Sequence, residues 1–170
     1  MKLKDTLVAA TAAILLFVLA YLWLSEDGIK VAPEIELTLL DGQKLALKDL
    51  QGQPILVTFW ATTCIGCRRE VPHLIDLYNK YQPQGLEILA IAMHYDPPAQ
   101  VLIFKQQKKI PYTIALDLKN EAARAFGGVR LTPTTFVINK KGRIVFQKIG
   151  EFNVAAMDAL VKKLIAEPGK

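Results

Sequence analysis

Two stretches of the chain are apolar at almost every position, and a segment with helical spacing separates them. Ile55–Trp60 is a continuous run of aliphatic, β-branched and aromatic residues, which is typical of a strand buried on both faces. Leu86–Met93 is a second such run with one charge, Glu87. Between them, apolar side chains recur every three or four residues, which predicts a helix from about Cys64 to residues 83–85. We therefore expect two central parallel strands joined by a right-handed crossover.

The rest of the chain alternates between strand and helix patterns. Residues 35–39 alternate apolar and polar side chains, which predicts a half-buried strand ending at the turn signal Asp41-Gly42. Further strands are predicted at 44–47, 111–116, 134–138 and 144–149, and further helices from Asp96 to about 108, at 120–126 and at 154–165. This order indicates an α/β sandwich with a mixed sheet. The carboxyl ends of the central strands then share the edge where α/β folds place their sites.

The N-terminus carries a different pattern. Thr6–Leu24 contains no charged residue and is long enough to span a bilayer as a helix. Lys2 and Lys4 precede it and acidic residues follow it, so the positive-inside rule places the following domain outside the cytoplasm. A cleaved signal peptide is the alternative, with a cleavage site at residues 18–20. The bulky residues 21–24 that would follow the cut favour a retained anchor.

Composition and charge narrow the possible classes of function. The chain has 170 residues, of which 52% are hydrophobic and 22% charged, so it is not a disordered protein. We divide it into an anchor at 1–24, a linker at 25–33 and one domain at 34–170. The net charge is +5, but the densest basic group, Lys105, Lys108 and Lys109, has no aromatic residues interleaved with it. A nucleic-acid partner is therefore not predicted.

The candidate chemistry lies where the first central strand meets its helix. Cys64 and Cys67 are the only cysteines of the chain. Free backbone N–H groups and the helix dipole favour a thiolate at Cys64, and Cys67 lies close enough on the same helical turn to reach it. A structural disulfide closing so short a loop would stabilise the fold very little. We therefore interpret Cys64 and Cys67 as a redox-active pair that needs no metal or organic cofactor.

The residues around this pair resemble a known family. Residues 59–72 read F-W-A-T-x-C-x-x-C-x-x-E-x-P, and T-P-T-T-F follows at 132–136. This combination is similar to the membrane-tethered thioredoxin-like proteins of the TlpA/ResA type, over about residues 32–166. The resemblance implies a thioredoxin-like fold with an inserted helix and strand, and thiol–disulfide exchange outside the cytoplasm. It also implies that Cys64 is the nucleophile, Cys67 the resolving thiol and Pro133 a cis-proline facing them.

The chain departs from the family pattern at three positions. Thr63 stands where the family commonly has tryptophan, and Gly66 where it often has proline. Thr58 occupies the central-strand position where thioredoxin carries a buried aspartate.

Supporting roles are predicted for Trp60, Glu70, Asp96 and Thr132. Asp96 fits the N-cap of the helix that follows it, and the resemblance places a proton-transferring acid close to this position in some relatives. Glu70 is expected to contact Arg68 or a backbone amide in a structural role.

The two histidines have different expectations. His94 follows the second central strand and is read equally well as a base or as a strand-end polar residue. His73 is expected to face solvent on the far side of its helix.

These observations favour a membrane-anchored dithiol oxidoreductase in the inner membrane of a bacterial-type cell, with its domain in the periplasm or outside the cell. The expected partners are exported cysteine-containing proteins and an upstream thiol protein that donates electrons; cytochrome c maturation is a family association. One alternative is a peroxidase of the peroxiredoxin type, although that usually has threonine at the position of Ala61. The other is a copper carrier that uses both thiolates and His94.

Overall fold

One eight-stranded mixed sheet runs through the computed structural model, which describes Thr11, residues 13–16 and residues 30–168. The strands lie in the order β1-β8-β7-β4-β5-β6-β2-β3. Their bounds are β1 Lys30–Val31, β2 Glu36–Leu39, β3 Lys44–Ala46, β4 Ile55–Trp60, β5 Glu87–Ala92, β6 Thr113–Leu116, β7 Thr134–Ile138 and β8 Arg143–Ile149. The helices are α2 Ile65–Tyr81, α3 Pro98–Lys108, α4 Glu121–Ala125 and α5 Val154–Ala166, with 3₁₀ turns η1 Leu47–Leu50 and η2 Gln82–Gln84.

The two apolar runs form the centre of the sheet, as predicted. β4 and β5 are parallel and in register from Ile55 opposite Glu87 to Trp60 opposite Ala92. Every residue of β4 is buried, because the strand has neighbours on both sides and helices on both faces. β6 continues the parallel part beyond β5, whereas β7 runs antiparallel to β4. The mixed α/β sheet predicted from the sequence is therefore confirmed.

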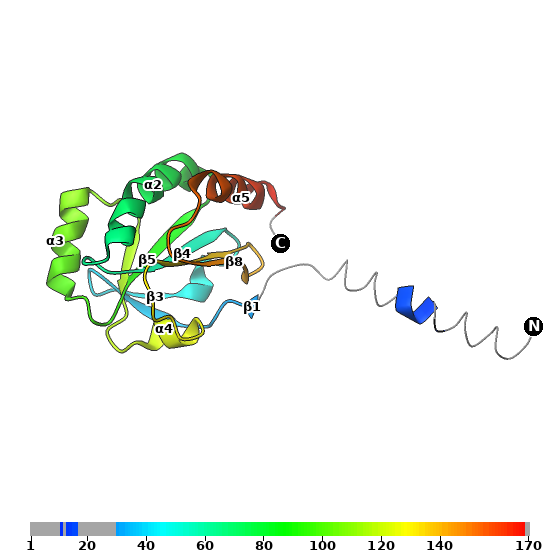
Figure 1. Ribbon diagram of the computed structural model, residues 1–170, viewed down its shortest axis with the longest axis horizontal. Coiled ribbons are helices and arrows are strands. Elements are labelled where there is room, and N and C mark those ends of the chain that lie inside the picture. The colour runs from blue at the N-terminus through cyan, green and yellow to red at the C-terminus, as the bar shows by residue number, and fades with distance from the viewer. Residues whose placement is uncertain (1–10, 12, 17–29, 169–170) are drawn as a thin grey trace, which may run out of the picture.

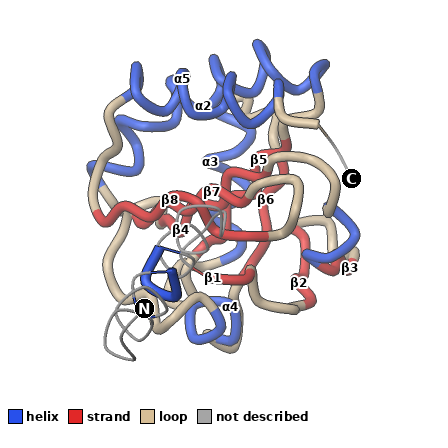
Figure 2. Tube along the Cα trace, turned by 90° about the vertical axis from the view of Figure 1, so that its right-hand side faces the viewer, coloured by secondary structure: helices blue, strands red, loops and turns tan. Residues whose placement is uncertain are grey.

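Helices cover the two faces of the sheet unequally. α2, α3 and α5 pack on one face, and α4 packs on the other (Figures 1 and 2). The alternation of side chains along β4 explains both cores: Leu56 and Trp60 point toward the first face, and Val57 and Phe59 toward the second. A strand that is apolar at almost every position is thus what a three-layer arrangement requires.

Three predicted boundaries are corrected. Lys30–Val31 lies in the predicted linker but pairs with β8 as β1, so the sheet begins before residue 34. The strand predicted at 44–47 ends at Ala46, because Leu47 begins η1. The strand predicted from residue 111 begins only at Thr113. Proline at 111 has no N–H to donate to a sheet ladder.

The start of α3 differs from the prediction in a way that affects the site. Asp96 is not the N-cap of this helix: Pro97 takes that position, Pro98 is the first helical residue, and no side chain caps the helix. Proline at the first helical position is favourable because the N–H it lacks would have no partner there. The Asp96 side chain is therefore available for a different contact.

The predicted anchor at residues 6–24 lies outside the described residues, apart from Thr11 and residues 13–16, which are helical. Among the residues that the structure describes, no helix combines the length and the apolar character needed to cross a membrane.

Candidate active site

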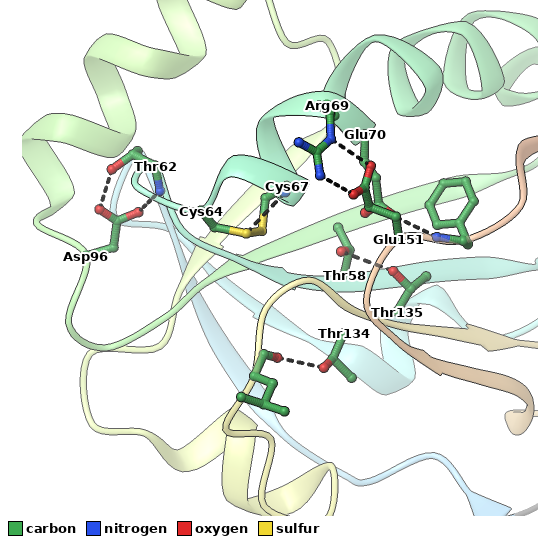
Figure 3. The surroundings of a disulfide bond; sticks show 12 residues. Thr58, Thr62, Cys64, Cys67, Arg69, Glu70, Asp96, Thr134, Thr135 and Glu151 are labelled. Atoms are coloured by element: carbon green, nitrogen blue, oxygen red, sulfur yellow. Dashed lines mark hydrogen bonds and ion pairs between the residues drawn. A yellow bond between two sulfur atoms is a disulfide. The ribbon is translucent and has the colours of Figure 1, made fainter.

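Cys64 and Cys67 lie at the beginning of α2, just after the end of β4, and a disulfide with an S–S distance of 2.11 Å joins them (Figure 3). Cys64 is the N-cap of α2, and its Sγ accepts a hydrogen bond from the Cys67 N–H at 3.1 Å. The N–H of Cys67, the third residue of the helix, therefore points at the Cys64 sulfur. An N–H donor at this place stabilises a thiolate when the pair is reduced.

The two sulfur atoms differ in their access to solvent. Cys67 is 3% exposed and belongs to the core on the α2 face of the sheet. Cys64 is only partly buried, and the next residue, Ile65, is 71% exposed. A partner protein can therefore reach Cys64 but not Cys67.

The Thr132–Pro133 peptide bond is cis, as the resemblance implies. The Pro133 loop lies against the first turn of α2, because a Cβ added to Gly66 would sit 3.3 Å from Cδ of Pro133. The Pro133 carbonyl accepts from the Gly150 N–H at 2.8 Å, which fixes the loop to the end of β8. Thr132 is half-buried in this loop. The close approach gives a reason for glycine at position 66.

Glu70 is a buried carboxyl group beside the buried cysteine. Its side chain is 3% exposed, and Oε1 accepts from the backbone N–H of Phe152 at 2.8 Å. Burial raises the pKa of Glu70 to about 7; the Phe152 hydrogen bond opposes this shift and the charge of Glu151 adds to it. Glu70 and Cys67 line the same small cavity, so this carboxyl group is placed to exchange a proton near Cys67.

A threonine and two aromatic residues are among the other residues that line the cavity shared by Glu70 and Cys67. Thr58 accepts a hydrogen bond from Thr135 Oγ1 at 3.3 Å, so the central strand supplies a hydroxyl here and not a carboxylate. Trp60 packs with its ring centroid 5.4 Å from that of Phe104, and among the described residues its Nε1 has no hydrogen-bond partner. Tyr112 is buried, and burial and the charge of Glu70 both raise its pKa.

The two arginines after Cys67 have separate partners. Arg69 forms a bidentate ion pair with Glu151, with Nε to Oε2 at 3.1 Å and Nη2 to Oε1 at 2.5 Å (Figure 3). The hydrogen bond from Arg69, and then its charge, lower the pKa of Glu151. The Arg68 guanidinium lies 5.9 Å from the centre of the Phe104 ring. Of the two partners predicted for Glu70, the structure therefore shows the backbone amide, that of Phe152, and not Arg68.

The loop after β5 brings Asp96, and not His94, into contact with the turn that precedes Cys64. Both carboxylate oxygens of Asp96 accept hydrogen bonds from Thr62, two residues before Cys64 (Figure 3). His94 is exposed, with its ring edge-on to that of Tyr95. His73 is exposed, as predicted. The part of the chain that the structure describes holds no group of three or more His, Cys, Asp or Glu side chains placed to bind a metal.

Sequence reasoning missed two contributors to this site. Glu151 is 82 residues from its partner Arg69, and no local pattern marks it. Thr62 falls within the motif that carries the resemblance, but nothing in the sequence indicates its partner.

Comparison with known proteins gives a consistent set of relatives. A sequence profile of the AhpC/TSA family matches residues 29–147. The thiol-disulfide oxidoreductase ResA of Bacillus thuringiensis (strain Al Hakam) is 36% identical over 135 residues, which cover 79% of this chain and 77% of the relative. The protein of the same name from Geobacillus thermodenitrificans (strain NG80-2) is 36% identical over 113 residues, 66% of this chain and 64% of the relative.

Two solved structures are similar over most of the chain. A putative thioredoxin from Neisseria meningitidis superposes with a TM-score of 0.74 at 31% identity, covering 81% of this chain and 91% of the other. A putative thiol:disulfide interchange protein DsbE from Chlorobium tepidum has a TM-score of 0.75 at 26% identity, covering 84% of this chain and 100% of the other.

Proposed function

Because the chain belongs to the AhpC/TSA family and is a thiol-disulfide oxidoreductase related to ResA, we propose that its Cys64–Cys67 pair reduces disulfides in exported proteins. The observation that carries this proposal is the asymmetry of the pair. Cys64 is accessible and its sulfur accepts a hydrogen bond from the Cys67 N–H in the first turn of α2, whereas Cys67 is buried beside Glu70. One thiol is suited to attack a partner and the other to act only within the protein.

The proposed reaction has two exchange steps. The Cys64 thiolate attacks one sulfur of a partner disulfide, so that a Cys64–partner bond forms and the second partner sulfur leaves as a thiolate. The Cys67 thiol then gives its proton to Glu70 and attacks the Cys64 sulfur. This closes the Cys64–Cys67 disulfide and expels the first partner sulfur as a thiolate. The two partner thiolates take up protons from solvent, so that the partner leaves as a dithiol, and Glu70 returns its proton to solvent. Two electrons pass from the pair to the partner, and an upstream thiol protein restores the reduced pair.

The charges around the pair support a reducing direction. Glu70 shares a cavity with Cys67. A carboxylate near a thiol disfavours its thiolate, and a pair whose Cys67 thiolate is not stabilised is the stronger reductant. The guanidinium of Arg69 does not offset the charge of Glu70, because Glu151 is already paired with it.

We expect a low reduction potential for the pair. Equilibration of the full-length protein with glutathione or dithiothreitol buffers, followed by alkylation and mass spectrometry, should give about −250 mV or lower. A value near −120 mV, typical of a strong oxidant, would show that the pair works in the opposite direction.

We also propose that residues 1–24 anchor the domain to a bacterial-type inner membrane, with the domain on the outer side. The charge pattern around Thr6–Leu24 supports this orientation. Among the described residues of this stretch, Ile14, Leu15 and Leu16 are 63%, 62% and 67% exposed, so a lipid environment would bury apolar surface that the domain leaves uncovered.

The anchor predicts a defined topology. After cell fractionation the full-length protein should stay with the membranes through carbonate extraction, and protease added to spheroplasts should degrade its domain. A variant in which a cleavable signal peptide from another exported protein replaces residues 1–24 should be released as a soluble protein. Recovery of a soluble wild-type chain that begins near Tyr21 would show that the N-terminus is a cleaved signal peptide.

Two assays separate the proposed function from the alternatives. A peroxidase would consume hydrogen peroxide with a thiol donor, although a buried Ala61 occupies the position where peroxiredoxins usually have threonine. A copper carrier would bind Cu(I) through the reduced pair and lose this binding when His94 is replaced. We expect neither activity.

A further inference from the structure

A buried carboxylate joins the two loops at the sheet edge next to the cysteine pair. Asp96 is 4% exposed. Its Oδ2 accepts from the Thr62 N–H and its Oδ1 from Thr62 Oγ1, each at 2.6 Å (Figure 3). The two residues are 34 positions apart in the chain. Hydrogen bonds to a carboxylate are about twice as strong as those between neutral groups, so this double contact fixes Thr62 in place.

Thr62 lies inside the turn that delivers Cys64 to the helix. The Cys64 N–H donates to the Ala61 carbonyl at 3.1 Å, which closes residues 61–64 into a tight turn. Cys64 is then the N-cap of α2, and its sulfur accepts from the Cys67 N–H at 3.1 Å. Movement of Thr62 would therefore shift the Cys64 sulfur relative to this donor.

The loop that carries Asp96 is itself held to the end of β4. The Asp96 N–H donates to the Met93 carbonyl at 2.9 Å, and the Met93 N–H donates to the Trp60 carbonyl at 3.0 Å. Pro97 and Pro98 follow directly. Proline fixes its own φ and restricts the residue before it, so the backbone presents the carboxylate in one place.

We propose that Asp96 is a positioning residue for the attacking thiol: through Thr62 it holds Cys64 where the Cys67 N–H stabilises the Cys64 thiolate. This inference rests on the proposed role of Cys64 as the nucleophile. A thiolate gains more from an N–H donor than a disulfide sulfur does, because hydrogen bonds to charged groups are stronger. Loosening the turn should therefore disfavour the reduced, ionised form of Cys64.

The first test removes only the hydroxyl contact, in the full-length protein in detergent. Thr62→Val preserves the shape of the side chain but cannot donate to Oδ1 of Asp96. We expect alkylation of Cys64 by iodoacetamide at pH 7 to become about three- to tenfold slower. The equilibrium constant for reduction by glutathione should fall by a similar factor, which corresponds to about 15–30 mV. Thr62→Ser keeps the hydroxyl and should stay within about twofold of wild type.

The second test is a double-mutant cycle. In the Asp96→Ala background the acceptor is gone, so Thr62→Val should change the alkylation rate less than about twofold further. Asp117→Ala is the matched control, since Asp117 is equally buried and accepts from two N–H groups, those of Ala122 and Ala123. It should lower the melting temperature as Asp96→Ala does, yet leave Cys64 alkylation unchanged.

Two results would overturn the inference while leaving the proposed function intact. The first is a folded Thr62→Val protein that matches wild type within twofold in both the rate and the equilibrium constant. Alternatively, its effect could be the same with and without the Asp96 carboxylate, so that the two residues do not act together. If instead the wild-type protein is alkylated first at Cys67, the nucleophile is misassigned, and the proposed function and this inference fail together.

Discussion

The Cys67→Ala protein is expected to accumulate mixed disulfides with exported cysteine-containing proteins, whereas the Cys64→Ala protein should accumulate essentially none. Cys64 is accessible and can attack a partner without help from Cys67. Only Cys67 is placed to release that partner, because the two sulfur atoms are within bonding distance. Non-reducing electrophoresis of acid-quenched cells that express each variant measures the difference.

The double variant Cys64→Ala/Cys67→Ala is the control for non-specific association. The steady-state reduction of a model disulfide should fall to the uncatalysed level in all three variants. Equal trapping by the Cys64→Ala and Cys67→Ala proteins would contradict the assignment of Cys64 as the attacking thiol and Cys67 as the resolving thiol. Trapping in neither variant would favour the copper-carrier alternative.

Glu70→Gln should slow the release of the partner from the mixed disulfide by about a hundredfold at pH 7. Glu70 shares the cavity with Cys67, and its pKa of about 7 lets it accept a proton at neutral pH. Glutamine keeps the shape and can still accept from the Phe152 N–H, but it cannot take a proton. Rapid mixing of the reduced protein with a disulfide peptide, quenched with acid, measures formation and decay of the mixed disulfide separately. Formation should change little.

The same substitution has a second signature in the stability of the oxidised protein. Because the folded-state pKa of Glu70 is raised from 4.5 to about 7, its protonated form is the one that the fold favours. The stabilisation is fully present below about pH 4.5 and is lost as the pH rises through 7. Wild type should therefore lose about 2 kcal/mol of unfolding free energy, relative to Glu70→Gln, between pH 4.5 and pH 8.

Urea unfolding across this pH range tests the expectation, with the exposed Glu121→Gln as the control that should follow wild type. If the wild-type and Glu70→Gln curves run parallel with pH, the carboxyl group does not titrate in this range. If partner release is also unaffected, Glu70 has only a structural role.

The centre of the fold could be predicted because its sequence pattern is unambiguous. β4 and β5 are buried on both faces, and only a continuous apolar run satisfies that environment. The change from this run to helical spacing fixes where Cys64 must lie. β1 could not be predicted in the same way, since Lys30–Val31 is too short to show a period and joins the sheet by pairing with β8.

The site was predictable only as far as its contacts are local. In the sequence, Asp96 followed by two prolines fits a helix N-cap as well as it fits the loop position that the structure shows. The carboxylate instead bonds to Thr62, 34 residues away, and this distant contact has no local signal. The ion pair of Arg69 with Glu151 and the amide that Phe152 donates to Glu70 both depend on the β8–α5 loop lying over α2. The periodicity of apolar residues in a sequence does not indicate which distant segments come into contact.

The order in which the two reduced cysteines react tests the central claim most directly. Reduced full-length protein would be exposed briefly to a limiting amount of iodoacetamide at pH 7, quenched with acid and mapped by mass spectrometry. The N-cap position and exposure of Cys64 predict that nearly all early label is on Cys64. Label that appears first on Cys67, or equally on both cysteines, would contradict the assignment of Cys64 as the attacking thiol.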